Sequence, residues 1–411
     1  MRLSFNMQFT QSLNGILTAQ QRMAKAETQL SRQTRILSPA DDPAGAAKVL
    51  TLEQGKAQIE QYQSNSILLK NNLGLQETVL TNMRTAMDRV LTLAIASGNG
   101  TYSDEERGTV AAEIKNIQIQ LLDIMNTRSP DGSYIFAGFQ DKVVPYEFDT
   151  TVGKFMFQGD EGARSLQISP SVALPSTSSG KLIFDEVFER FRTTPPNVIA
   201  GSPSSVQLDI TNQKQFDGFF RQQYDGITPA NNDFSIALDG LGNYEFLRNG
   251  TALTPPVTGT FTPGIPISFN GLTLTISGAA AAPGEIQFSL EQPKKTNILN
   301  AIDEFVNALN TPLIDINTLK TSIQDMLVSV ENTSSNISAT LAQLGGRINV
   351  TDSVFGLNAD LLITNQQYKA DISEVDLAAA LTEIKRQEVA LQATSQVFAK
   401  IGSTTLFDYL R

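Results

Sequence analysis

The sequence predicts a mainly α-helical protein with an inserted β-rich domain, in which both chain ends together build a long antiparallel helical bundle or coiled coil. Composition changes near Gln140 and again near Gln292, and the two outer parts resemble each other more than either resembles the middle. The outer parts place apolar residues at helical spacing, whereas the middle collects most of the Gly, Pro, Thr and Phe and carries hairpin signals. We therefore expect a terminal segment at 1–40 and 380–411 that is a coiled coil or is disordered in the monomer, a helical bundle domain at 41–140 and 294–379, and an outer β-rich domain at 141–293.

The first helix is expected from a thin apolar stripe, two members of which are only Ala: Ile16, Ala19, Met23, Ala26, Leu30 and Leu37. Asp42 followed by Pro43 then predicts the start of the next helix. The carboxylate accepts an unpaired helix N–H, and proline has no N–H to satisfy at the first helical position. The adjacent carboxylates of Asp41 and Asp42 offer too few oxygens for a calcium site.

The longest helix is predicted by apolar residues at alternating spacings of three and four from Leu52 to Ala94. This stripe exceeds an ordinary helix of roughly 8–20 residues, so it should pack along another long helix. Ser103 and Glu106 form a capping box before a third stripe, Val110 to Ile124, which should fold back antiparallel on the long helix.

After the middle region, a short helix is expected over Ile298–Leu309 and a long one from Ile316 to Leu344. Gly345-Gly346 follows, and each helical Gly costs about 1 kcal/mol relative to Ala. This pair therefore predicts a break, a kink or the close approach of another backbone.

The last stripe contains Leu377, Leu381, Ile384, Leu391 and Phe398, with Glu388 and Ser395 inside it. Alone it should be only marginally stable. The two chain ends are thus expected to form helices together, or to order when neighbouring copies supply apolar surface.

The middle region carries turn residues between alternating apolar runs. Asn270-Gly271 predicts a two-residue hairpin, and Asp239-Gly240 and Val152-Gly153-Lys154 predict two more. Asp185 to Phe191 is expected as a short helix between strands.

Composition excludes many functions. The 411 residues include no His, Cys or Trp, which rules out Cys/His zinc sites, thiol nucleophiles and a Ser-His-Asp triad. The formal net charge of -11 disfavours nucleic acid or an anionic membrane as partner. The N-terminus lacks the apolar stretch of a signal peptide, and no apolar run approaches the length of a membrane span. We expect no catalytic residue, cofactor or metal.

Four stretches resemble the bacterial flagellins and their hook-associated relatives. Gln29–Ile36 with Pro39–Gly45 resembles the N-terminal signature, Ser133–Phe139 a "YxFaGf" segment, and Ile372–Ala378 a C-terminal "aevDla" segment. The tail Ser403–Leu410 resembles the "SLFDYL" ending of junction members of this family rather than the Asn-rich ending of filament flagellins. Two positions depart from the family pattern. Arg32-Gln33-Thr34 stands where filament flagellins usually show Ser-Gly, and Gly345-Gly346 stands where members of the family more often carry a single Gly.

The resemblance implies a structural adaptor between flagellar hook and filament, located outside the cell and exported by the flagellar type III route without a cleaved signal peptide. It implies a homo-oligomeric ring, contacts with another hook-associated protein and flagellin, and a cytoplasmic export chaperone. The expected assembly residues are Leu13, Ile16, Met23, Leu391, Phe398, Leu406, Phe407, Tyr409 and Leu410. The tail could instead dock on its own N-terminal helix.

Other functions stay open at this point. A filament-forming flagellin is the nearest alternative, followed by a secreted coiled-coil adhesin. A hydrolase that uses two carboxylates of the middle domain is the enzymatic alternative.

Overall fold

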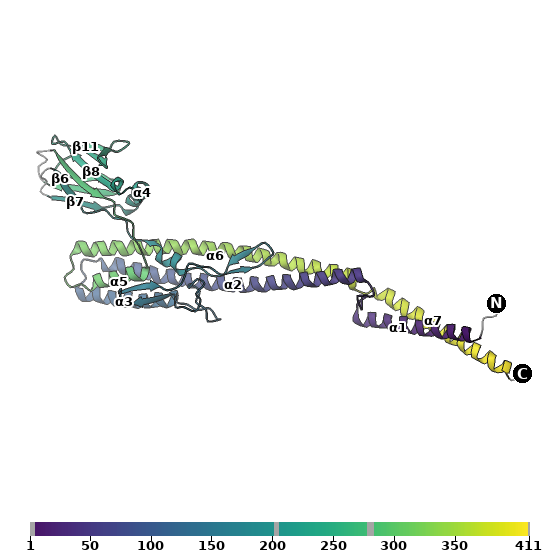
Figure 1. Ribbon diagram of the computed structural model, residues 1–411. Helices are drawn as coiled ribbons and strands as arrows, with labels where there is room; N and C mark the ends of the chain where they lie inside the picture. Colours follow the sequence, from purple (N-terminus) through teal and green to yellow (C-terminus); the bar gives the residue numbers. More distant parts are fainter. Residues whose placement is uncertain (1–4, 201–204, 278–282, 410–411) are drawn as a thin grey trace. The chain divides into compact units, whose positions relative to one another are not determined.

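The computed structural model describes residues 5–200, 205–277 and 283–409 (Figure 1). The chain divides into two compact units. Unit 1 comprises Met1–Asn71, Leu166–Leu174 and Arg347–Arg411, and unit 2 comprises Asn72–Ser165 and Pro175–Gly346. Long helices come from both chain ends and strands from the middle, so the predicted fold class is confirmed.

The helices are α1 (Phe5–Arg32), α2 (Pro43–Ser97), α3 (Asp104–Met125), η1 (Lys181–Asp185), α4 (Gln213–Gln223), η2 (Pro229–Asn232), α5 (Ile298–Leu309), α6 (Ile316–Ser373) and α7 (Leu377–Tyr409). The strands are β1 (Tyr146–Asp149), β2 (Lys154–Phe157), β3 (Ser165–Gln167), β4 (Ala173–Pro175), β5 (Val187–Phe188), β6 (Asn197–Ala200), β7 (Ser205–Ile210), β8 (Asp233–Leu238), β9 (Asn243–Arg248), β10 (Thr251–Ala252), β11 (Thr258–Thr260), β12 (Ile267–Phe269), β13 (Leu272–Ser277), β14 (Gly284–Ser289) and β15 (Lys295–Thr296).

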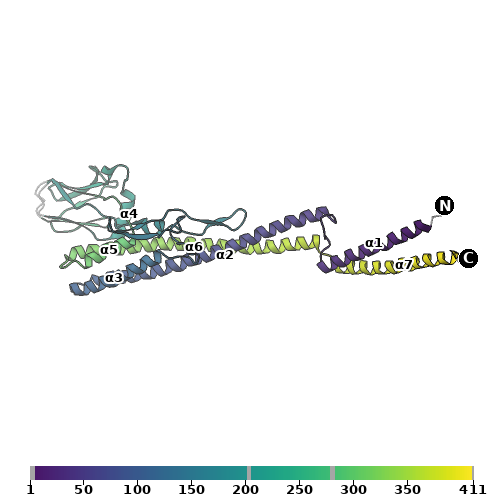
Figure 2. The same ribbon diagram turned by 60° about the horizontal axis from the view of Figure 1, so that its bottom comes forward.

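In unit 2, α3 and α5 run beside the parts of α2 and α6 that belong to this unit (Figures 1 and 2). The predicted seam of α2 is buried there, and Leu80, Met83, Met87 and Val90 have no exposed side-chain surface. The capping box of α3 is confirmed, because Ser103 Oγ accepts the N–H of Glu106 while the Glu106 carboxylate accepts the N–H of Ser103. Because these apolar seams are buried, the helices of unit 2 share one hydrophobic core.

The outer strands form a β-rich domain with a phenylalanine core. One sheet has the order β10-β9-β8-β14-β6, with β11 also on β9, and a second has the order β12-β13-β7. Helix α4 brings Phe216, Phe219 and Phe220 into the core, where the Phe219 ring lies 5.3 Å from Phe234 and 5.2 Å from Phe269. Because Phe234 belongs to the first sheet and Phe269 to the second, α4 joins the two.

The three predicted hairpins are confirmed. Strands β12 and β13 pair with Phe269 opposite Leu272, and both turn residues have positive φ, Asn270 at 45° and Gly271 at 82°. This is the two-residue turn that matches strand twist. The β8–β9 and β1–β2 hairpins follow the other two turn signals.

Two predictions about local structure are wrong. No helix forms over Asp185–Phe191, because the short helix of this region, η1, lies earlier and ends at Asp185. Val187–Phe188 instead form a strand that pairs with β15, and the side chain of Val187 is buried there. At Gly345-Gly346, the expected break and the expected close approach are wrong, since α6 is continuous and no other backbone lies within 4 Å of a Cβ placed on either glycine, whereas the kink stays a prediction. Burial of Leu344 and Thr351 on either side holds the helix together.

The boundaries of the outer domain remain a proposal. Its aromatic core runs from Phe191 to Leu290. The preceding segment hydrogen-bonds to helices instead. Gln76 donates to Ser176 O at 2.8 Å, Asn300 donates to Phe155 O at 3.0 Å, and Asn332 donates to Phe188 O at 2.8 Å.

Candidate assembly site at the chain ends

Helices α1 and α7, from opposite ends of the chain, lie side by side and antiparallel in unit 1 (Figures 1 and 2). A Cβ placed on Gly15 would lie 3.7 Å from Thr394 Cγ2, which fixes the register near the middle of the pair. The expectation that the two ends form helices together is confirmed.

The core of this helix pair is thin. Among the described side chains of α1 and α7, the buried ones are Ala19, Ala26, Ala380 and Gln387. Large apolar side chains remain exposed on both helices: Met7, Leu13, Leu17, Leu377, Leu381, Val389 and Val397. Small buried residues give little hydrophobic stabilisation, and exposed apolar groups of this size favour burial against another chain.

The seam of α7 differs from the predicted stripe. A line of buried and half-buried positions at spacings of four and three runs through Ala380, Ile384, Gln387, Leu391, Thr394 and Phe398. Leu377 and Leu381 lie off this seam and are about half exposed, 51% and 52%. The prediction failed there because Ala and Thr were not counted as contact positions, although they permit close helix approach.

The two family-like signatures from opposite ends of the chain meet at the corner between the helix pair and the long helices. Arg35 N–H donates to Ser373 O at 2.7 Å, and Thr34 Oγ1 donates to the same oxygen at 3.0 Å. Thr34 also forms an antiparallel bridge with Glu374. A short two-stranded contact therefore ties the α1–α2 turn to the α6–α7 turn.

Arg35 and Asp42 connect this corner to the start of α2. The Arg35 guanidinium donates to Ile372 O at 2.9 Å and to Asp42 Oδ2 at 3.1 Å, while Asp42 Oδ1 accepts the N–H of Gly45 at 2.9 Å. Helix α2 begins at Pro43, directly after Asp42, which is the arrangement expected of an Asp cap followed by Pro. The Gly45 N–H, followed by Arg35, lowers the pKa of the Asp42 carboxyl.

Asp41 holds the other side of the turn. Its carboxylate accepts Lys25 Nζ at 2.6 Å and the N–H groups of Leu37 and Ser38 at 3.1 Å each. The hydrogen bond from Lys25, followed by that from Ser38, lowers the pKa of this carboxyl. The two neighbouring carboxylates thus act on different groups, one on α1 and the turn, the other on α2 and Arg35.

Arg32-Gln33-Thr34 stands where similar sequences usually have Ser-Gly, and Gln33 has φ 54°, in the left-handed region. A residue with a Cβ is strained there by about 1–2 kcal/mol, whereas Gly is not. Gln33 therefore adopts a backbone conformation that glycine would adopt without strain.

The predicted assembly residues divide into three groups. Ile16, Met23, Leu391 and Phe398 are half-buried on the α1–α7 seam, and Leu13 is 40% exposed. The side chains of Leu406, Phe407 and Tyr409, and the whole of Leu410, lie outside the described residues. Sequence reasoning missed Thr34 and Arg35 as joining residues, although the signature that contains them pointed to this turn.

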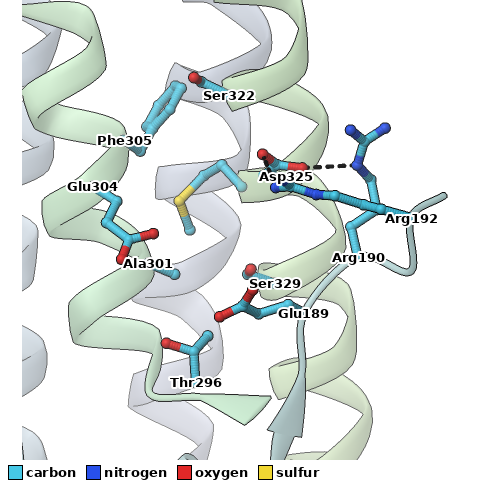
Figure 3. Close-up of a pocket in the computed structure, with 11 residues that line it drawn as sticks. Glu189, Arg190, Arg192, Thr296, Ala301, Glu304, Phe305, Ser322, Asp325 and Ser329 are labelled. Atoms are coloured by element: carbon cyan, nitrogen blue, oxygen red, sulfur yellow. Dashed lines mark hydrogen bonds and ion pairs between the residues drawn. The ribbon is translucent and has the colours of Figure 1, made fainter. Parts of the chain in front are cut away.

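A cavity of about 120 Å³ lies between α5, α6 and the segment that leads into the outer domain (Figure 3). Its main polar feature is Asp325, whose carboxylate accepts Arg190 Nε at 2.7 Å and Arg192 Nη2 at 2.5 Å. Both arginines are therefore occupied in fixing this segment on α6. Glu304, another carboxylate of the lining, is ion-paired with Lys154 at 3.5 Å.

Residues 5–200, 205–277 and 283–409 contain no cluster of three or more Asp, Glu, His or Cys that could hold a metal ion. Over the same ranges, no helix is long and apolar enough to cross a membrane.

Comparison with known proteins gives a consistent result. Residues 3–141 match the model of the bacterial flagellin N-terminal helical region. The chain is 23% identical to flagellar hook-associated protein 3 of Escherichia coli over 99% of both chains. It is 30% identical to the Salmonella typhimurium protein of the same name over 187 residues, 46% of this chain and 58% of that one.

Solved structures agree in fold. Flagellar hook-associated protein 3 from Legionella pneumophila aligns with a TM-score of 0.58 at 21% identity, over 79% of this chain and 98% of that one. The family model and the full-length similarity confirm the resemblance seen in the sequence: the chain is similar to flagellar hook-associated protein 3 along its length, and residues 3–141 match the flagellin N-terminal helical region.

Proposed function

We propose that this chain is the structural adaptor subunit that joins the bacterial flagellar hook to the flagellin filament, and that it assembles through its terminal helices. The observation that carries this proposal is the corner of unit 1, where segments 337 residues apart are joined by Arg35 and Ile372. Similarity to hook-associated protein 3 over nearly the whole chain supports the same role.

The helix pair supplies the means of assembly. Because α1 and α7 bury mainly alanines against each other and expose Leu13, Leu17 and Val397, they gain apolar burial when copies or neighbouring proteins pack against them. The apolar tail Leu406, Phe407, Tyr409 and Leu410 extends this interface. The half-buried side chains of Ile16, Met23, Leu391 and Phe398 stabilise the contact between α1 and α7.

The partners follow from this role. The chain forms a ring with its own copies and contacts a second hook-associated junction protein on one side and flagellin on the other. It is exported unfolded without a cleaved signal peptide, is held beforehand by a cytoplasmic chaperone, and acts outside the cell in the flagellum. It takes no cofactor and catalyses no reaction.

A filament-forming flagellin is the second candidate. The tail Ser403–Leu410 argues against it, since filament flagellins end differently, and so does similarity to hook-associated protein 3 along both helical ends and the middle. A secreted adhesin is disfavoured because both ends match flagellar proteins together. The hydrolase alternative needs two carboxylates of residues 141–293, whereas Asp325 and Glu304 of the described cavity lie outside that range and are ion-paired.

Deletion of the gene tests the adaptor proposal. Cells without it should carry intact hooks, lack filaments and release filament protein into the medium, and a plasmid copy should restore filaments. A variant without residues 404–411 should be exported and folded yet absent from hook tips. Normal filaments on deleted cells would refute the adaptor role, whereas normal swimming with the truncated variant would refute only the role of the tail.

A further inference from the structure

Helix α6 carries a second apolar stripe in unit 1, separate from the one that faces α2. The inner seam there contains the buried residues Thr351 and Asn358. The second stripe alternates spacings of three and four: Arg347, Val350, Val354, Leu357, Leu361, Thr364, Tyr368 and Asp371. This is the pattern of a helix that packs along another helix.

Four of the five apolar members of this outer stripe are exposed to solvent, and Val354 is half-buried. Val350 is 43% exposed, Leu357 56%, Leu361 46% and Tyr368 59%. Within the part of the chain that the structure describes, these side chains therefore keep much of their surface uncovered.

Both ends of the outer stripe carry a charge that has no partner among the described residues. Arg347 makes no hydrogen bond or ion pair with its side chain to any described residue, and its Nη1 is enclosed without an acceptor. Partial burial lowers the pKa of its guanidinium. The nearest carboxylate after it on α6, Asp352, is already paired with Lys70 at 2.8 Å. At the other end, the exposed Asp371 likewise forms no ion pair in the described structure.

The outer stripe is complementary to itself. Placed antiparallel against an identical stripe, Arg347 meets Asp371, Val350 meets Tyr368, Val354 meets Thr364, and Leu357 meets Leu361. Each layer joins the two kinds of heptad position, as antiparallel coiled coils require, and the arrangement has a two-fold axis near residue 359. The partly buried guanidinium of each copy thereby gains a carboxylate of the other copy.

We propose that the occupant of this stripe is a second copy of this chain, bound antiparallel through residues 347–371 of α6, with Arg347 of each copy paired to Asp371 of the other. Neighbours in a ring point the same way, so this pair is a state of the free chain, distinct from the ring contact. It covers apolar surface of α6 in the folded chain that is not incorporated into a flagellum. With two Val, two Leu and one Tyr per copy, the contact is modest and dissociates at micromolar concentration.

Charge reversal tests the pairing by sedimentation of the purified full-length chain. Arg347→Asp alone and Asp371→Arg alone should each weaken the dimer at least tenfold, because like charges then meet in two layers. The double variant should restore it. Asp360→Arg is the matched control, since Asp360 is exposed on the same helix outside the stripe, and it should leave the dimer intact.

Cysteine cross-linking tests the orientation, and the absence of native Cys makes it unambiguous. Positions 350 and 368 lie about 27 Å apart along one helix, so they cannot join within a chain. Val350→Cys with Tyr368→Cys in one chain should give a covalent dimer, while each single variant should not. A chain that stays monomeric at 100 µM overturns the proposal, and so does a dimer insensitive to both reversals or cross-linked by a single cysteine. None of these results bears on the adaptor role, which the gene deletion tests.

Discussion

Leu80 of α2 offers a quantitative test of the helical core, because its side chain has no exposed surface in the seam of unit 2. Truncation of such a leucine to alanine destabilises a protein by about 2–5 kcal/mol. Leu80→Asp also places a carboxylate without a partner in the seam, and the desolvation of that group adds several kcal/mol. The sum, above about 5 kcal/mol, equals much of the stability of a typical domain.

Urea unfolding followed by circular dichroism at 222 nm measures this effect at pH 7. Leu80→Asp should lose most of its helical signal in buffer, and Leu80→Ala should show a lowered midpoint. Leu68→Asp is the matched control, since it makes the same change on the same helix at a side chain that is 50% exposed, and it should change stability by less than about 0.5 kcal/mol. A Leu80→Asp protein with the wild-type midpoint would refute the assignment of this seam as the core.

Three further predictions concern turns and caps. Gln33→Gly should stabilise the chain by up to about 1 kcal/mol, because relief of left-handed strain exceeds the added freedom of the unfolded chain, and Gln33→Ala should not; urea midpoints decide this. In thermal melts, Gly271→Ala should destabilise the outer domain much more than Gly264→Ala does. Both positions have φ 82°, but a Cβ on Gly271 would contact Asn212 O and lie 2.7 Å from Phe216 N, whereas a Cβ on Gly264 would have no atom within 4 Å. The lowered pKa of Asp42 means that its contribution to stability is complete above about pH 4 and is lost as pH falls through the folded-state pKa. Asp42→Ala should therefore reduce the loss of unfolding free energy on the acid side of a plot against pH. Equal acid-side slopes for the variant and the wild type would contradict this.

Much of the fold could be predicted because its signals are local. The α2 seam repeats over many turns, and the Ser103–Glu106 box and the Asn270-Gly271 turn each act within four residues. The continuous α6 could not be predicted in the same way. Two glycines weaken a helix locally, whereas the burial of Leu344 and Thr351 on either side depends on tertiary packing that the local sequence does not reveal.

The candidate site was predicted only in part for a related reason. The signatures at Arg35 and at Ile372 were both recognised, yet only the folded chain brings these residues within 2.9 Å of each other. The exposed stripe of α6 was missed because apolar residues off the main seam look like scatter until the burial of each position is known.

Labelling the protein in the intact flagellum tests the central claim most directly. Ile227 is 93% exposed in the outer domain, and the chain has no other thiol, so Ile227→Cys can be marked with maleimide-linked gold in cells that express only this variant. Electron microscopy should show a single narrow band of gold at the boundary between hook and filament. Gold distributed along the whole filament, or elsewhere on the cell surface, would contradict the adaptor role.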